Sequence, residues 1–247
     1  MRTVLLAAVL SLTAACGGAE ADISAAAEGE TAKRVAWWGE EGGFVLPSVN
    51  VLRPPRVVLY GDGLVIVDAR RQVNIGAAEA SEAVAAMEKS LAGQPPTAEP
   101  KEGAPQVADV PTTVFGVLGK DAKPVEVRVE ALEQVAEFYP KQITDAKDLM
   151  NGLATRATEK GADYVSDRVR VVAESAASAE GKPSAWPAGV PEPSGEVDPV
   201  WQTDLKGAAA EAIVKAVPDG QEYGRALFRT GSGALFTLSW RYLLPDE

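Results

Sequence analysis

The fold of this chain is decided by the stretch Arg56-Val57-Val58-Leu59-Tyr60-Gly61-Asp62-Gly63-Leu64-Val65-Ile66-Val67-Asp68. Two runs rich in β-branched residues surround a Gly-Asp-Gly turn, a strong short-range indication of a β-hairpin. Aspartate and glycine tolerate the positive backbone angles that such a turn needs. The stretch therefore predicts two antiparallel strands joined at residues 61–63.

Two more hairpins are predicted on similar grounds. The second hairpin has strands at residues 112–118 and 124–129, joined by a turn at 119–123. The strand at 124–129 alternates apolar and charged residues, which predicts that one of its faces is buried and the other is exposed to solvent. Residues 224–230 and 234–244 surround a Gly-Ser-Gly turn. The first and last hairpins share the same order of segments, an apolar run, a turn flanked by glycines and a second apolar run. A distant internal duplication would explain this likeness, and so would hairpin geometry alone.

Three amphipathic helices are predicted between these hairpins, because apolar residues recur at spacings of three and four. The first covers residues 76–91, the second begins at a cap formed by Thr144 or Asp145, and the third is capped by Asp204 and ends before Pro218. Their apolar stripes are Ala80, Val84, Met87 and Leu91; Leu149, Leu153, Ala154 and Ala157; and Leu205, Ala209, Ile213 and Val217.

The remaining segments complete an α+β pattern. Prolines at 47, 54 and 55 predict an extended, edge-like passage, residues 168–173 alternate as a strand, and residues 93–111 and 176–200 have loop composition. We expect residues 35–247 to form a single α+β domain. Its sheet would be mainly antiparallel, built from the three hairpins, with the three helices packed on it.

The N-terminus has the composition of an export signal. Arg2 precedes an apolar run at residues 4–12, and small residues precede Cys16, the only cysteine. The run is too short to cross a bilayer, which takes about 20 apolar residues. Cleavage after residue 15 is therefore expected, either in a lipoprotein signal or in an ordinary secretory peptide with an incidental cysteine. Residues 16–34 are Ala/Gly/Glu-rich and are interpreted as a flexible tether.

This arrangement resembles the lipobox of bacterial lipoproteins, in which the cysteine receives diacylglycerol and becomes the new N-terminus. The family usually has leucine three positions before the cysteine, where this chain has Thr13. The resemblance implies lipidation of Cys16 and attachment to the outer face of the cell membrane through the N-terminal lipid. Two or three acyl chains would make that attachment durable.

Composition excludes several classes of function. The 247 residues carry a net charge of −11 and no histidine, so a nucleic-acid partner is not expected. A Ser-His-Asp triad, a histidine base and imidazole metal sites are excluded. If Cys16 is acylated no other thiol remains, so disulfides and thiol catalysis are excluded as well. What remains is carboxylate chemistry, a Ser/Lys pair or oxygen-only cation binding.

Asp62, Trp37 and Trp38 are the candidate residues for contact with a ligand or partner. Asp62 stands at a hairpin tip with Asp68 beyond the next strand, but the spacing does not resemble a calcium loop, and a turn role explains Asp62 as well. Exposed tryptophans stack on sugars or anchor partners, although most pack in cores. Adjacent strand residues point to opposite faces, so one of the two tryptophans could remain exposed.

No catalytic residue, metal ligand or cofactor is predicted. No Ser-x-x-Lys occurs in the mature domain. An acidic protein contains many pairs of carboxylates that could flank a glycosidic bond, and most such pairs are simply surface groups in contact with solvent. Arg168 and Arg170 share one strand face, where they could hold an anion or form salt bridges. The carboxylates considered for a glycosidase pair are Glu133, Glu137, Asp145 and Asp148.

Four short motifs are similar to a family of actinobacterial secreted or lipid-anchored proteins of unknown function. They are Leu59-Tyr60-Gly61-Asp62-Gly63, Asp109-Val110-Pro111-Thr112-Thr113, Trp186-Pro187 and residues 241–247. The family tends to have Arg-Pro where this chain has Arg241-Tyr242. The resemblance implies an envelope location and a shared fold, and no activity.

These observations favour a non-enzymatic, lipid-anchored envelope domain that binds or scaffolds another envelope protein or a cell-wall component. A carboxylate-dependent cell-wall hydrolase is the first alternative. A small protein inhibitor or substrate-capture module is the second.

Overall fold

The computed structural model describes residues 33–247, except residues 120, 177–181, 195–196 and 219–225. All described residues belong to one compact unit. The predicted signal peptide, Cys16 and nearly all of the predicted tether lie outside the described residues. Within the described residues, no helix has both the length and the apolar character that a membrane span requires.

Among the described residues, the first sheet has eight strands in the order β5-β7-β6-β1-β2-β3-β4-β8. Neighbouring strands are antiparallel except for β5 and β7, which are parallel. The strands are β1 (Arg34–Glu41), β2 (Val57–Tyr60), β3 (Leu64–Val67), β4 (Arg71–Asn74), β5 (Thr97–Ala98), β6 (Thr112–Leu118), β7 (Pro124–Glu130) and β8 (Ala162–Asp163).

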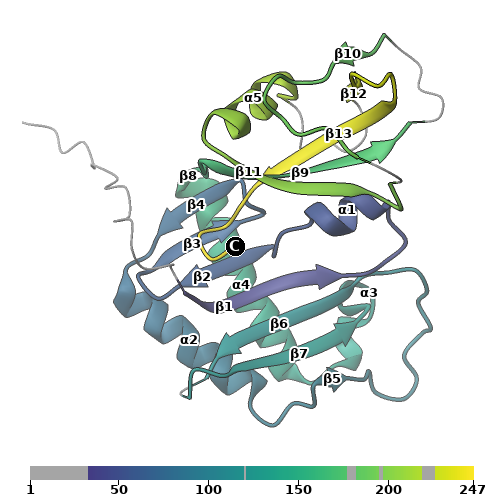
Figure 1. The fold of residues 1–247 in the computed structure, drawn as a ribbon. Coiled ribbons are helices and arrows are strands. Elements are labelled where there is room, and N and C mark those ends of the chain that lie inside the picture. Colours follow the sequence, from purple (N-terminus) through teal and green to yellow (C-terminus); the bar gives the residue numbers. More distant parts are fainter. Residues whose placement is uncertain (1–32, 120, 177–181, 195–196, 219–225) are drawn as a thin grey trace, which may run out of the picture. The chain divides into compact units, whose positions relative to one another are not determined.

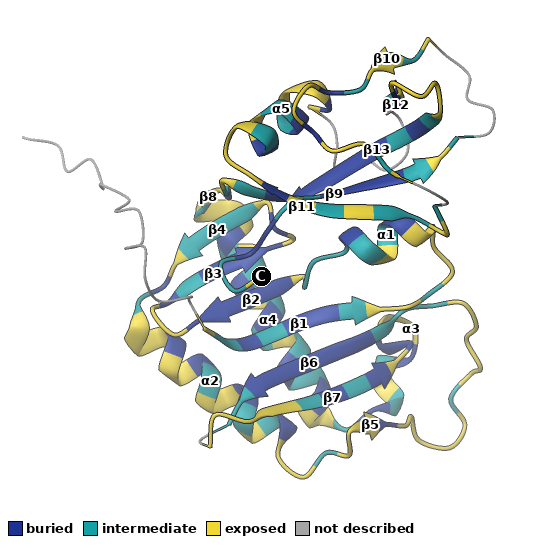
Figure 2. Ribbon diagram, viewed as in Figure 1, coloured by how far each residue is buried: buried dark blue, intermediate teal, exposed yellow. Residues whose placement is uncertain are grey.

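Helices α2 (Ala77–Leu91) and α4 (Lys141–Lys160) cover one face of this sheet, as Figure 1 shows. All four residues of β2 are buried (Figure 2). Val57 and Leu59 pack in the core under the helices, whereas Val58 and Tyr60 pack on the opposite face. The predicted hairpin thus lies inside the sheet, because its strands are apolar on both faces.

In the part of the chain that the structure describes, the second sheet has five strands in the order β10-β12-β13-β9-β11. Its alternating strand β9 places Val169, Val171 and Ala173 in a separate core with Ile213 of the helix α5. The elements are β9 (Arg168–Ser175), β10 (Ser184–Ala185), β11 (Trp201–Lys206), β12 (Ala226–Arg229), β13 (Leu235–Tyr242) and α5 (Ala208–Ala216).

The last residues of the chain lie against the face of the first sheet that α2 and α4 leave open. Leu244 packs in a cluster with Val58, Tyr60 and Ile66. The Tyr60 hydroxyl donates a 2.7 Å hydrogen bond to Asp246, and Arg34 forms an ion pair with the same carboxylate. The C-terminal segment therefore connects the two sheets through β2 and β1.

The α+β class and all three predicted hairpins are confirmed. The prediction of one sheet built from the three hairpins was incomplete, because β12 and β13 belong to the second sheet and α5 packs there. The two parallel strand pairs, β5 with β7 and β10 with β12, make the sheets mixed. Both pairs involve two-residue strands in the segments predicted to be loops.

Three local predictions were wrong. Residues 47–52, predicted as extended, form the helix α1 (Pro47–Leu52), since proline is favoured at the first helical position. Helix α4 begins at Lys141 after Pro140, so Thr144 and Asp145 are inside it. Asp204 lies within β11, and α5 begins after Gly207. Short helices α3 (Leu132–Val135) and η1 (Ala136–Phe138) lie within residues 130–140, for which the sequence predicts no particular element.

Candidate functional site

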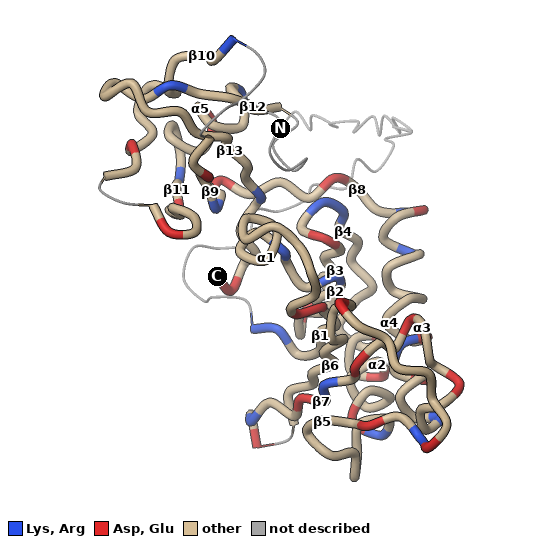
Figure 3. Tube along the Cα trace, turned by 90° about the vertical axis from the view of Figure 1, so that its right-hand side faces the viewer, with Lys and Arg blue, Asp and Glu red and all other residues tan. Residues whose placement is uncertain are grey.

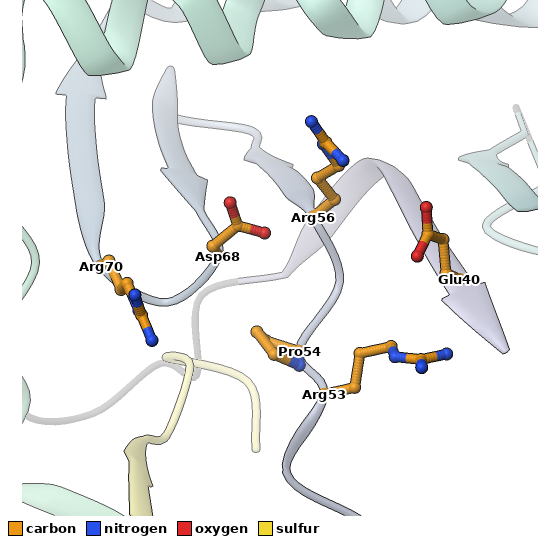
Figure 4. Close-up of a pocket in the computed structure, with 6 residues that line it drawn as sticks. All are labelled: Glu40, Arg53, Pro54, Arg56, Asp68 and Arg70. Atoms are coloured by element: carbon orange, nitrogen blue, oxygen red, sulfur yellow. The ribbon is translucent and has the colours of Figure 1, made fainter. Parts of the chain in front are cut away.

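An open cavity of about 240 Å³ lies where loops meet the ends of β1, β2 and β3. Figure 4 shows that its residues come from three separate segments of the chain. We call it the arginine pocket, because three of its six residues are arginines. Its lining consists of Glu40, Arg53, Pro54, Arg56, Asp68 and Arg70.

Helix α1 and the prolines after it place the first two arginines. The Arg53 amide donates to the Val49 carbonyl at 2.8 Å, which completes the last turn of α1. Arg53 itself is extended, with φ −61° and ψ 111°, because a residue before proline avoids the helical region. Pro54 and Pro55 then lead directly into Arg56 and β2. The short helix and its abrupt end therefore hold Arg53 and Arg56 on the same cavity.

A tight turn between β3 and β4 places the other two charged groups. Asp68 and Ala69 both have φ 51°, and the Arg70 amide donates to the Val67 carbonyl at 2.9 Å. Positive φ at both central residues is the geometry of a type I′ hairpin turn. The Asp68 amide also donates to the Arg56 carbonyl at 3.0 Å. This bond fixes the turn beside the start of β2.

Arg53 and Arg56 are held by neutral partners. Arg53 Nη1 donates to the Gly42 carbonyl at 2.9 Å, and the Arg56 guanidinium lies 4.8 Å from the centroid of the Trp38 ring. Neither arginine forms an ion pair with a described residue. Other described arginines do pair with carboxylates, namely Arg34, Arg71, Arg128, Arg156, Arg170 and Arg241.

Asp68 is exposed at the rim of the pocket, although the surrounding groups perturb its carboxyl. Partial desolvation by neighbouring protein atoms raises the pKa of Asp68 above its ordinary value, and the negative charge of Glu40 acts in the same direction. Arg56 and Arg70 oppose this rise in the pKa without cancelling it. The carboxyl group of Asp68 is therefore more easily protonated than that of a free aspartate.

Only one of the residues predicted to contact a ligand lies next to this pocket. Trp38 is 1% exposed and stacks on Phe115 with ring centroids 6.3 Å apart. It therefore contributes to the pocket only by holding the Arg56 guanidinium over its ring. Trp37 points to the other face of the sheet, where it is half-buried. Neither tryptophan is an exposed platform.

Asp62 lies at the far end of β3 from Asp68, so the structure does not bring the two together. Its Oδ1 accepts a 3.0 Å hydrogen bond from the Leu64 amide, which is the turn role that explains it without a ligand. Cys16, the predicted lipidation site, lies outside the described residues.

Sequence reasoning missed the three arginines, which are separated by up to 17 positions and share no motif. It also did not predict the exposed apolar group at Phe44, whose side chain is 89% exposed next to the exposed Val45 and Leu46. A usable signal was present: Phe44 follows the glycine pair 42–43 and precedes Pro47. Three consecutive apolar residues between such breakers have no regular strand or helix to bury them.

A second charged cluster lies at the C-terminal segment, where its role is structural. Arg241, 5% exposed, donates two hydrogen bonds to Glu247 at 2.6 and 2.7 Å. Burial alone raises the pKa of Glu247, but hydrogen bonds from Arg241 and the Leu244 amide, with the charge of Arg241, hold it below its ordinary value. Of the two arginines predicted to share a face of β9, Arg170 pairs with Asp204. Arg168 donates to main-chain oxygens of the C-terminal segment.

Charge is otherwise dispersed, since acidic and basic positions are interspersed along the described chain in Figure 3. No group of three or more acidic or cysteine side chains among the described residues is arranged to hold a metal ion. Compared with known proteins, the chain matches no protein-family model, no curated protein and no solved structure.

Proposed function

We propose that this protein is a lipid-anchored, non-enzymatic domain on the outer face of the cell membrane that binds another component of the envelope. The anchoring half of the proposal is supported by the sequence alone: a short apolar run followed by small residues and the lone Cys16. The binding half is supported by the arginine pocket.

The binding proposal rests on the contacts that hold the guanidinium groups of Arg53 and Arg56. This protein is acidic and has many carboxylates with which arginines can pair. Most of its described arginines form such ion pairs. These two are instead fixed by a carbonyl and by an aromatic ring, next to a cavity. Positively charged groups that are held in place without an ion pair favour a site for an anionic ligand.

Anchoring is tested by fractionating cells that express the full chain. Cys16→Ser should move the protein from the membrane fraction to the medium or the soluble fraction, because the lipid-accepting sulfur is lost. Thr13→Leu is the matched control, since it changes the same segment toward the usual lipobox and should leave the protein on the membrane. A Cys16→Ser protein that stays membrane-bound contradicts the anchoring proposal.

Binding is tested by affinity capture from solubilised envelopes with the full chain as bait. The Arg53→Gln and Arg56→Gln variants serve as paired baits, and Arg156→Gln, whose arginine pairs with Glu79 on the helix face, is the control. A component that is retained by the wild type and the control, and lost with the pocket variants, supports the proposal. Equal retention by all four baits contradicts a role for the pocket in capture.

A carboxylate-dependent cell-wall hydrolase is favoured by one different observation. Glu40 and Asp68 line the same cavity, and a carboxyl group with a raised pKa is suited to act as a general acid. Turnover of purified cell-wall fragments that disappears in both Asp68→Asn and Glu40→Gln would establish this alternative. Fragments that remain intact with the wild-type protein exclude it.

A further inference from the structure

The arginine pocket has positive charge fixed in place before any ligand arrives. Immobilising a flexible side chain opposes binding, so contacts that already hold a guanidinium reduce that cost. Arg53 is held by Gly42 and Arg56 by the ring of Trp38. Neither contact neutralises charge, and both leave other N–H donors of the guanidinium available, since arginine has five.

The size of the cavity limits what can enter it. Its volume of about 240 Å³ is below the roughly 300–1,000 Å³ of pockets that enclose a drug-sized ligand. The cavity is also open to solvent, because Arg56, Asp68 and Arg70 at its rim are exposed. It therefore suits one anionic group of a larger molecule, with the rest of that molecule outside.

We propose that the arginine pocket binds an oxyanion group, a phosphate or a carboxylate, through the arginines that line it, and that Asp68 weakens this binding when it is ionised. Planar guanidinium groups bind the oxygens of phosphate and carboxylate in pairs, which a point charge does not. This inference rests on the proposed function, since it names the chemistry of the ligand that the domain would hold.

The acidic residues of the pocket set the sign of the pH dependence. Asp68 faces Arg56, Arg70 and Glu40, the charged groups that act on its carboxyl. A bound anion adds a negative charge next to Asp68. It also competes with Asp68 for Arg56 and Arg70. Protonation of Asp68 removes that competition, so oxyanion affinity should rise as pH falls through the titration of Asp68.

The test uses the full chain purified in detergent, titrated at constant ionic strength with inorganic phosphate and, separately, with malonate. Calorimetry and the NMR signals of the arginine Nε–H groups report binding. We expect saturable binding at one site for at least one probe. The preferred probe distinguishes a phosphate from a carboxylate ligand, and either preference supports the proposal.

Three substitutions in the pocket and one outside it identify the site. Arg53→Gln and Arg56→Gln should each weaken binding about tenfold or more, since each removes a charge-assisted donor. Arg53→Lys should recover part of the affinity, because it restores the charge but not the planar fork. Arg156→Gln removes the same charge from α4 and should bind like the wild type.

Asp68→Asn tests the role assigned to the carboxylate. With sulfate as the probe, whose charge is constant over this pH range, the variant should bind more tightly than the wild type at neutral pH. It should also lose most of the pH dependence. An Asp68→Asn protein that binds sulfate more weakly, or with an unchanged pH profile, overturns this part of the proposal.

Two outcomes overturn the site itself: no saturable binding of either probe, or equal weakening by Arg156→Gln and the pocket variants. Far-UV circular dichroism and thermal unfolding identify variants that fail to fold. Arg53→Gln then remains informative if Arg56→Gln disturbs Trp38. Cys16→Ser should bind the preferred probe like the wild type, so failure of lipid anchoring and failure of the pocket give different results.

Discussion

The hydroxyl of Tyr60 and the carboxylate of Asp246 are joined by a 2.7 Å hydrogen bond across 186 positions of sequence. Tyr60 ends β2, a strand buried on both faces, and Asp246 belongs to the C-terminal segment. Burial, together with this hydrogen bond and the negative charge of Asp246, raises the pKa of Tyr60 far above its ordinary value. The hydroxyl therefore acts as a permanent donor at any pH that the fold tolerates.

Tyr60→Phe should destabilise the protein by about 1–2 kcal/mol, because it removes a hydrogen bond to a charged, partly buried acceptor. The loss is limited because Arg34 still pairs with Asp246. Urea unfolding measures the change. Tyr242→Phe is the matched control, since the structure gives the Tyr242 hydroxyl no hydrogen bond among the described residues, and its effect should stay within about 0.5 kcal/mol. Equal effects of the two substitutions would contradict the role assigned to Tyr60.

Gly116→Ala should destabilise the protein by about 1–3 kcal/mol through overpacking. A Cβ at this position of β6 would lie 2.0 Å from the Trp37 ring, which covers the glycine from the neighbouring strand. Gly152→Ala is the control on α4, where a Cβ meets nothing within 4 Å. There the change should instead stabilise the helix by about 0.5–1 kcal/mol. The two variants should therefore shift the urea midpoint in opposite directions.

Acid should weaken the fold partly through Glu247. Because its folded-state pKa is lowered, this carboxylate contributes stability that is present above its unfolded-state pKa and is lost as pH falls through the folded-state pKa. Glu247→Gln should therefore lower stability at neutral pH and flatten the acid limb of the stability curve. Glu159→Gln, at an exposed position on α4, should leave that limb unchanged. An acid limb unaffected by Glu247→Gln would contradict the assignment.

Asp68 should have the opposite effect on stability. Its folded-state pKa is raised, so the folded protein holds this proton more tightly than the unfolded chain, and stability falls as pH rises through the folded-state pKa. Asp68→Asn should therefore raise the thermal midpoint at neutral pH. Asp62→Asn, at the other end of β3, keeps its side-chain acceptor for the Leu64 amide and should change little. A lower midpoint for Asp68→Asn would contradict this prediction.

Local patterns predicted much of the fold because several elements are decided by local residues. The hairpin at 56–68 and helix α2 follow from β-branched runs and from a three-to-four spacing. Asp204 misled the prediction because an aspartate before an apolar stripe is a common cap, whereas here it pairs with Arg170 across two strands. Only the partner strand distinguishes the two roles.

The pairing of strands that are distant in sequence was not predictable from these patterns. β1 pairs with β2 on one side and with β6 on the other, and nothing in residues 34–41 specifies either partner. The same limit applies to the arginine pocket. Arg53 follows a helix, Arg56 precedes a strand and Arg70 ends a turn, so only the assembled sheet brings the three together.

The position of β1 also has a mechanical consequence. The described chain enters the fold at this strand, which is hydrogen-bonded along both sides by β2 and β6. Ladder hydrogen bonds run perpendicular to the strands, so tension applied at residue 33 along β1 loads both ladders in shear, and many bonds resist at once. A domain pulled from this end should withstand force better than one attached through a terminal strand that can peel away bond by bond.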